Sequence, residues 1–141
     1  MSLRKRVLIL CTGNSARSQM AEGLLRALGG EKVQVFSAGI DPSFVRPEAI
    51  EVMAEAGIDI STQRSKSVTE FANEFFDYVI TVCDHAKAHC PIFSGAVKRL
   101  HWSIEDPAGF SGEQASEKFR AARDDLQERI KAFVASELVS D

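Results

Sequence analysis

The fold is decided by the stretch Leu8-Ile9-Leu10-Cys11-Thr12-Gly13-Asn14-Ser15-Ala16-Arg17-Ser18. An apolar run that begins after Arg6 leads directly into a cysteine, which is typical of a strand covered on both faces. A short polar loop with one glycine follows, and a helical spacing of apolar residues begins after Arg17. A strand, a tight loop and a helix N-terminus in this order form a place where backbone amides can hold an anion.

The rest of the chain alternates helix patterns with strand patterns. Helix patterns, with apolar residues three and four apart or a capping signal, cover residues 17–28, 47–56, 67–75 and 119–133. Strand patterns, rich in apolar and β-branched residues, cover residues 6–10, 33–38, 78–82 and 97–102. This alternation predicts an α/β fold, with helices on both faces of a four-stranded parallel sheet, in a single domain over residues 1–141.

Length, charge and composition exclude several classes of protein. The chain has 141 residues, three cysteines and a formal net charge of −3, which gives no case for nucleic-acid binding. No apolar run approaches the ~18 residues of a transmembrane helix, and the stretch Val7–Leu10 is too short for a signal peptide. We therefore expect a cytoplasmic monomer without a membrane partner. In a reducing compartment, cysteines are more often catalytic or metal-binding than structural.

The loop between Cys11 and Arg17 is suited to binding a tetrahedral oxyanion. Gly13 and Asn14 tolerate the positive-φ conformations that a curled loop requires. The planar guanidinium of Arg17 can bind two oxygens of the anion. The same positive surroundings favour the nucleophilic thiolate of Cys11, to which the Ser18 hydroxyl could donate a hydrogen bond. The predicted oxyanion-binding residues are Thr12, Gly13, Asn14, Ser15, Ala16 and Arg17.

Three reactive side chains follow three different predicted strands. Cys11 ends the first strand, Cys83 follows the third, and Asp106 lies a few residues past the fourth. Ligands of parallel α/β sheets bind beyond the carboxyl ends of the strands. We therefore expect these three groups to meet at one edge of the sheet. The plain alternative for Cys11 is a small buried side chain at a strand end.

These motifs resemble a known family. The loop from Cys11 to Ser18 is similar to the phosphate-binding loop of low-molecular-weight protein tyrosine phosphatases. It is more similar still to that of the thioredoxin-coupled arsenate reductases built on the same fold. The resemblance covers nearly the whole chain, through residues 19–23, 37–39, Cys83, Cys90-Pro91, His101-Trp102 and 106–109. It implies a three-layer α/β/α architecture of the low-molecular-weight tyrosine phosphatase type.

The resemblance also implies a reaction, the reduction of arsenate to arsenite in arsenic detoxification. Cys11 would be the nucleophile, held with Arg17, and Asp106 would protonate the departing oxygen. Cys83 would then take the oxidation from Cys11, and Cys90 would carry it outward by thiol–disulfide exchange. Reduced thioredoxin would be the external electron donor, with no metal or organic cofactor. Phosphate or sulfate would compete with arsenate, and weak phosphatase activity is expected.

The segment from Cys83 to Cys90 leaves alternatives open. Two cysteines and the histidines His85 and His89 could bind zinc, although adjacent His89 and Cys90 fit no common zinc pattern. Two unrelated loop cysteines are a further possibility. In a helix the two cysteines would lie ~10 Å apart, whereas a disulfide needs Cα atoms within roughly 7 Å. A redox relay therefore requires a segment that unwinds, or one that is already a loop.

A further set of residues is implied to support the loop: Asn14, Ser18, Glu22, Ser37 and Lys66. Some reductases of this family place a monovalent cation under the loop, and Asn14, Glu22 and Ser37 resemble part of that site. Where an aspartate is expected near position 65, the chain has Lys66. Because an ammonium group beside Glu22 could replace the cation, we expect no potassium requirement.

Two other functions are compatible with parts of the sequence. A phosphatase for phosphotyrosine or small phosphoesters would be indifferent to Cys83 and Cys90. The tyrosines that usually follow the acid aspartate are replaced by Ala108-Gly109-Phe110, which favours a small inorganic substrate. A redox sensor or metal-binding module would need Cys83 and Cys90 but would be indifferent to Arg17.

Overall fold

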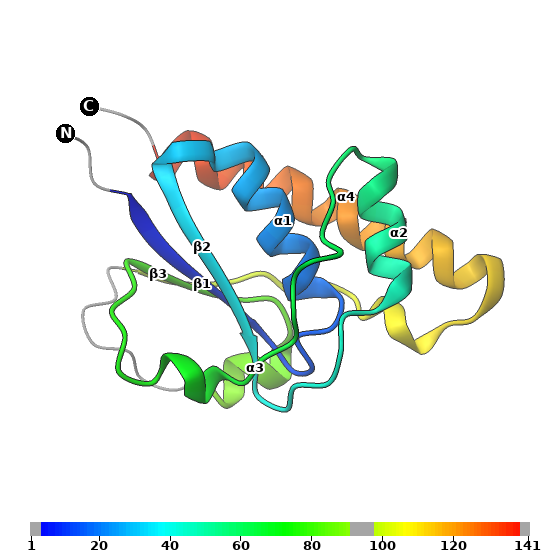
Figure 1. Cartoon of the computed structure of the whole chain (residues 1–141), viewed down its shortest axis with the longest axis horizontal. Coiled ribbons are helices and arrows are strands. Elements are labelled where there is room, and N and C mark those ends of the chain that lie inside the picture. Colours follow the sequence, from blue (N-terminus) through cyan, green and yellow to red (C-terminus); the bar gives the residue numbers. More distant parts are fainter. Residues whose placement is uncertain (1–3, 91–97, 139–141) are drawn as a thin grey trace.

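Four parallel strands form the sheet at the centre of the computed structural model, which describes residues 4–90 and 98–138 (Figure 1). The strand order is β2-β1-β3-β4. The strands are β1 (Lys5–Cys11), β2 (Val33–Gly39), β3 (Tyr78–Thr81) and β4 (Lys98–His101). β1 is interior because its apolar run is buried on both sides, and Cys11 pairs with Gly39 at its carboxyl end. The predicted α/β fold with a four-stranded parallel sheet is confirmed.

The helices follow the predicted order, but the last one begins seven residues before and ends four residues after the predicted range 119–133. The α-helices are α1 (Arg17–Gly29), α2 (Pro47–Glu55), α3 (Asp84–Ala88) and α4 (Gly112–Glu137). The 3₁₀ helices are η1 (Gly30–Lys32), η2 (Val68–Phe71) and η3 (Pro107–Gly109). The expected helix over 67–75 is shorter than predicted, since Phe75 lies beyond η2 and is exposed. The predicted strand residue Val97 lies outside the described residues.

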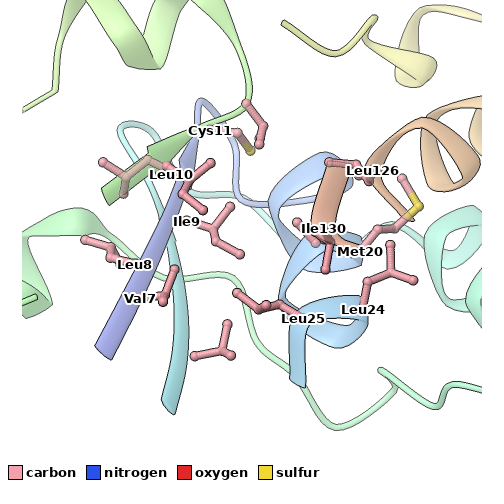
Figure 2. Close-up of a cluster of buried hydrophobic side chains, with 14 of the residues drawn as sticks. Val7, Leu8, Ile9, Leu10, Cys11, Met20, Leu24, Leu25, Leu126 and Ile130 are labelled. Carbon is pink, nitrogen blue, oxygen red and sulfur yellow. The ribbon is translucent and has the colours of Figure 1, made fainter. Parts of the chain in front are cut away.

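One face of the sheet is covered by α1 and α4. Figure 2 shows apolar side chains of both helices gathered on one side of β1. They are Met20, Leu24 and Leu25 of α1 with Leu126 and Ile130 of α4, all buried. Full burial of one such side chain contributes roughly 1.5–3 kcal/mol relative to exposure. This packing fixes α1, and with it the loop between β1 and α1.

The opposite face is covered by a thinner layer. The rings of Phe36, Phe71 and Phe76 meet edge to face, with centroids 5.6–5.8 Å apart. Phe36 belongs to β2, Phe71 to η2, and Phe76 precedes β3. The second helical layer of the predicted three-layer arrangement therefore consists of η2 and the short α3.

The carboxyl ends of the strands carry the predicted reactive groups. Cys11 is the last residue of β1, Cys83 is the N-cap of α3 just after β3, and Asp106 is the N-cap of η3 after β4. Parallel strands place these three connections at the same edge of the sheet. Within residues 4–90 and 98–138, we find no helix that is both long and apolar enough to span a bilayer.

Candidate active site

The loop between β1 and α1 turns its carbonyl groups outward. All the carbonyl oxygens of residues 11–16 accept hydrogen bonds from groups beside the loop. The donors are the amides of Ile40, Asp41, Ser43, Arg46 and Met20 and the side chains of Gln19 and Ser65. In a trans peptide a carbonyl and the following amide point in opposite directions, and no cis peptide occurs in the described residues. The amides of residues 12–17 therefore point to the inner side of the loop, the arrangement of an anion nest.

Asn14 holds this loop from beneath. Its φ angle is 47°, in the left-handed region that asparagine tolerates better than most residues. The side chain is fully buried, and its Nδ2 donates to Ser18 Oγ at 2.7 Å and to Ser37 Oγ at 3.0 Å. Its Oδ1 accepts from the Lys66 amide at 3.0 Å. Asn14 thus joins the loop to α1, β2 and the segment before η2.

The Cys11 thiol meets the hydroxyl of Ser18. The two side chains are buried, and Cys11 Sγ lies 3.0 Å from Ser18 Oγ. The Asn14 amide must present its nitrogen to Ser18, because its oxygen is engaged by the amide of Lys66. Ser18 Oγ therefore accepts from Asn14, which leaves its own hydrogen available for the Cys11 sulfur. The predicted contact between Ser18 and Cys11 is present, at a distance at which Ser18 can donate to the sulfur.

Arg17 connects the loop to the connection that carries Asp106. Its Nη1 donates to the Ile104 carbonyl at 3.0 Å, and its Nη2 lies 3.7 Å from Asp106 Oδ2. The Arg17 side chain is 13% exposed and that of Asp106 is 57% exposed. Arg17 therefore belongs to the interior of the site, whereas Asp106 stands at its rim, where it can exchange a proton with water. Asp106 Oδ1 also accepts from the Ala108 amide, which fixes the start of η3.

Cys83 lies directly against the oxyanion loop. It is buried, and its Sγ lies 3.3 Å from Thr12 Oγ1. The same sulfur accepts from the Ala86 amide at 3.4 Å, so Cys83 is the N-cap of α3. The second cysteine of the predicted relay is thus in contact with the residue that follows Cys11.

Cys90 lies beyond the other end of α3 and is half-buried. Its Sγ lies 3.7 Å from Nη1 of Arg99, a residue of β4. Burial raises the pKa of the Cys90 thiol, and the charge and hydrogen bond of Arg99 act against that rise. All three cysteines are present as thiols. With its thiols reduced, the segment is helical over Asp84–Ala88, so the unwinding that a disulfide to Cys83 requires stays a prediction.

The two histidines of this segment stack on each other at the surface. The rings of His85 and His89 are 4.2 Å apart, and both residues are exposed. Cys83, by contrast, is buried against Thr12. Across the described ranges, 4–90 and 98–138, no group of three or more His, Cys, Asp or Glu side chains is placed to hold a metal ion. This geometry gives no support to the zinc alternative.

A hydrogen-bonded chain through His101 was not predicted from the sequence. His101 Nδ1 lies 2.7 Å from Thr81 Oγ1, and its Nε2 lies 2.9 Å from Asp84 Oδ1. Thr81 ends β3, His101 ends β4, and Asp84 begins α3. These two hydrogen bonds therefore fix the start of α3, and with it Cys83, to the edge of the sheet. The sequence signal that could have indicated this contact is a polar residue at the end of each of two neighbouring strands, Thr81 and His101.

Lys66 lies beside Glu22, one of the residues that resemble part of the family's cation site. Its Nζ is 3.8 Å from Glu22 Oε1 and donates to the Arg64 carbonyl at 3.0 Å. Burial lowers the pKa of the Lys66 ammonium, and the Glu22 carboxylate acts against this effect. Glu22 also pairs with Arg26 at 2.6 Å and accepts from the Ser37 hydroxyl. The carboxylate beneath the loop is thus compensated by side chains of the protein itself.

Potassium is therefore expected to leave both turnover and melting temperature unchanged. The comparison is potassium chloride against sodium chloride at equal ionic strength, which removes general salt effects. Replacing Lys66 by methionine should lower the free energy of unfolding by about 1–3 kcal/mol, because Glu22 loses a partner. Lys32→Met, at an exposed lysine, is the matched control. A higher melting temperature of the wild type in potassium than in sodium would contradict the expectation.

Comparison with known proteins gives consistent results. The family model described as low molecular weight phosphotyrosine protein phosphatase matches residues 6–141. The chain is 42% identical over 132 residues to an arsenate reductase of Halalkalibacterium halodurans, an alignment covering 92% of this chain and 95% of the relative. A solved arsenate reductase in a phosphate-binding state has a TM-score of 0.80 and 36% identity, covering 96% of this chain and 99% of that one. A thioredoxin-dependent arsenate reductase of Corynebacterium glutamicum has a TM-score of 0.71 and 30% identity, covering 96% of this chain and 65% of that one.

Proposed function

The chain belongs to the low molecular weight phosphotyrosine protein phosphatase family, and we propose that its activity within that family is the reduction of arsenate to arsenite. The observation that carries this conclusion is the contact between Cys83 Sγ and Thr12 Oγ1 at 3.3 Å. A phosphatase needs the loop, Arg17 and Asp106, but has no use for a second thiol against its loop. A reductase needs that thiol, because the oxidation of the first cysteine must be passed on.

The reaction begins with attack of the Cys11 sulfur on arsenic. Arsenate is held by the inward amides of residues 12–17 and by the Arg17 guanidinium. A sulfur–arsenic bond forms, and one oxygen leaves as water with a proton from Asp106. Donors fixed in advance around a tetrahedral anion stabilise the transition state without reorganising.

Cys83 then completes the reduction. Its thiolate attacks the Cys11 sulfur, a disulfide forms, and the electron pair of the sulfur–arsenic bond stays on arsenic. Arsenic(V) becomes arsenic(III), and arsenite leaves the loop. Cys90 next attacks Cys83, the Cys11 sulfur leaves as the thiolate, and the disulfide now joins Cys83 to Cys90.

An external dithiol is needed to reduce the Cys83–Cys90 disulfide, and we propose that thioredoxin supplies it. Support comes from the relative that is described as thioredoxin-dependent. Cys90 is half-buried, whereas Cys11 and Cys83 are buried. The relay therefore moves the disulfide from an inaccessible to a more accessible position. This series of reactions would serve arsenic detoxification.

Turnover in variants of Cys83 and Cys90 tests the relay. The assay follows NADPH consumption with arsenate, thioredoxin and thioredoxin reductase. We expect sustained turnover by the wild type and none by Cys83→Ser. Cys90→Ser should release about one arsenite per protein and then stop, because its Cys11–Cys83 disulfide stays buried. Sustained turnover by either variant would contradict the three-cysteine relay.

The phosphatase alternative is tested in the same samples with p-nitrophenyl phosphate. Hydrolysis requires Cys11, Arg17 and Asp106, so Cys83→Ser should retain whatever phosphatase activity the wild type has. Good hydrolysis of the phosphoester by a wild type that shows no arsenate-dependent NADPH consumption would establish the phosphatase instead.

A further inference from the structure

A positively charged side chain lies against the third cysteine, outside the oxyanion site. Arg99 Nη1 approaches Cys90 Sγ to 3.7 Å. Both residues line a cavity of about 200 Å³, whose other walls include Lys87 and Leu100. The cavity lies between α3 and the strands β3 and β4, so an arginine of the edge strand reaches a thiol beyond the helix.

The direction of the Arg99 side chain follows from the strand that carries it. Successive residues of a strand point to opposite faces. Lys98 pairs with Glu137 of α4 at 2.8 Å, on one face of the sheet. Arg99 therefore points to the other face, where α3 and Cys90 lie. Two neighbouring cations of β4 thus serve different partners, and one of them is a reactive thiol.

Cys90 needs such a neighbour because of its surroundings. Burial disfavours the charged form of a thiol and raises the pKa of Cys90, while Arg99 favours that form. The thiolate, not the thiol, is the nucleophile in disulfide exchange. A half-buried thiol without a nearby cation would therefore be a slow participant at neutral pH.

We propose that Arg99 is a catalytic residue of the relay, whose guanidinium stabilises the Cys90 thiolate when it forms and attacks Cys83. This inference rests on the proposed arsenate reductase function. In the step concerned, the proton of Cys90 has gone to solvent and its sulfur bonds to Cys83 Sγ. The Cys11–Cys83 bond breaks, and its electron pair leaves on the Cys11 sulfur. One disulfide replaces another, so the step involves no net oxidation.

The first test measures the ionisation of Cys90 without arsenate. In the full-length chain with Cys11→Ser and Cys83→Ser, the alkylation rate of Cys90 by iodoacetamide is followed against pH by mass spectrometry. Arg99→Gln should move the midpoint of this profile upward by about one pH unit, a roughly ten-fold smaller thiolate fraction at neutral pH. Arg99→Lys, which keeps the charge, should have a midpoint close to that of the wild type. Lys98→Gln, the matched control on the opposite face, should leave the midpoint unchanged.

The second test follows the exchange step itself. Arsenate is added in equal amount to the chain with its three cysteines, without thioredoxin, and the Cys83–Cys90 disulfide is quantified after acid quenching. At neutral pH, the Cys90 thiolate of Arg99→Gln is scarcer, but each thiolate is intrinsically more nucleophilic. The two effects partly cancel, so this variant should form the disulfide only about three-fold more slowly than the wild type. At a pH above the alkylation midpoints of both proteins, the variant should form the disulfide as fast as the wild type or faster. Damage to the fold would slow the step at every pH, so this reversal is specific to the proposed role.

The two tests separate the inference from the function on which it rests. An alkylation midpoint that is the same in wild type and Arg99→Gln would overturn the role of Arg99, whatever the activity. A wild type that forms no disulfide with arsenate would overturn the arsenate reductase proposal, and the role of Arg99 in the relay with it. If Lys98→Gln moved the midpoint as much as Arg99→Gln, the effect would come from the total charge of β4 and not from the contact of Arg99 with Cys90. This result would also overturn the inference.

Discussion

Replacing Cys11 by serine is expected to abolish arsenate reduction, with turnover lower by a factor on the order of 10³ or more. The hydroxyl of serine forms neither the sulfur–arsenic bond nor the disulfide to Cys83. The fold should persist, because a hydroxyl at position 11 can still bond to Ser18, which lies 3.0 Å from the present sulfur. NADPH-coupled turnover measures the loss, and thermal unfolding measures the stability.

Cys11→Ser also separates binding from chemistry. The loop amides and Arg17 are unchanged in this variant, so phosphate measured by calorimetry should still bind. Hydrolysis of p-nitrophenyl phosphate should be lost with Cys11→Ser but kept with Cys83→Ser, which makes the two variants a matched pair. Arsenate turnover by Cys11→Ser within ten-fold of the wild type would show that another residue is the nucleophile.

Much of the fold follows from local patterns that agree with the tertiary structure. The apolar run of β1 and the helical spacing of α1 are each consistent with the layers they join. The Cys11–Arg17 loop between them was therefore predicted. Of the two residues named for positive φ, Asn14 adopts it and Gly13 does not. The order of the elements then sets the sheet edge at which Cys83 and Asp106 meet the loop.

The contacts that the sequence could not supply are those between distant segments. Lys98 and Arg99 are both cations of one short edge strand, and the pattern does not tell which faces Cys90. Gly39 is a further case, since a Cβ at this position would lie 2.6 Å from the Thr12 carbonyl oxygen. The glycine is required by the close approach of β2 to the loop, and that approach is set by the whole packing rather than by neighbouring residues.

Substitution of Asn14 is expected to have the second largest effect, on stability and activity together. Asn14→Gly keeps the positive φ but leaves Ser18, Ser37 and the Lys66 amide without their buried partner. We expect the free energy of unfolding to fall by about 2–4 kcal/mol. Turnover should fall by about 10²-fold, because displacement of the loop by an ångström is enough for such a loss. Denaturant unfolding and the NADPH-coupled assay measure the two effects.

Two further variants separate the conformation of Asn14 from its hydrogen bonds. Asn14→Ala loses the same bonds and must also adopt a φ of 47°, so it should be less stable than Asn14→Gly by roughly 1–2 kcal/mol. Asn14→Asp keeps the acceptor for the Lys66 amide but presents an oxygen to Ser18, whose hydrogen would then turn away from Cys11. This variant should lose more activity than stability. Asn73→Gly, at an exposed asparagine, is the control, and equal stability of Asn14→Gly and Asn73→Gly would contradict the role of Asn14 in holding the loop.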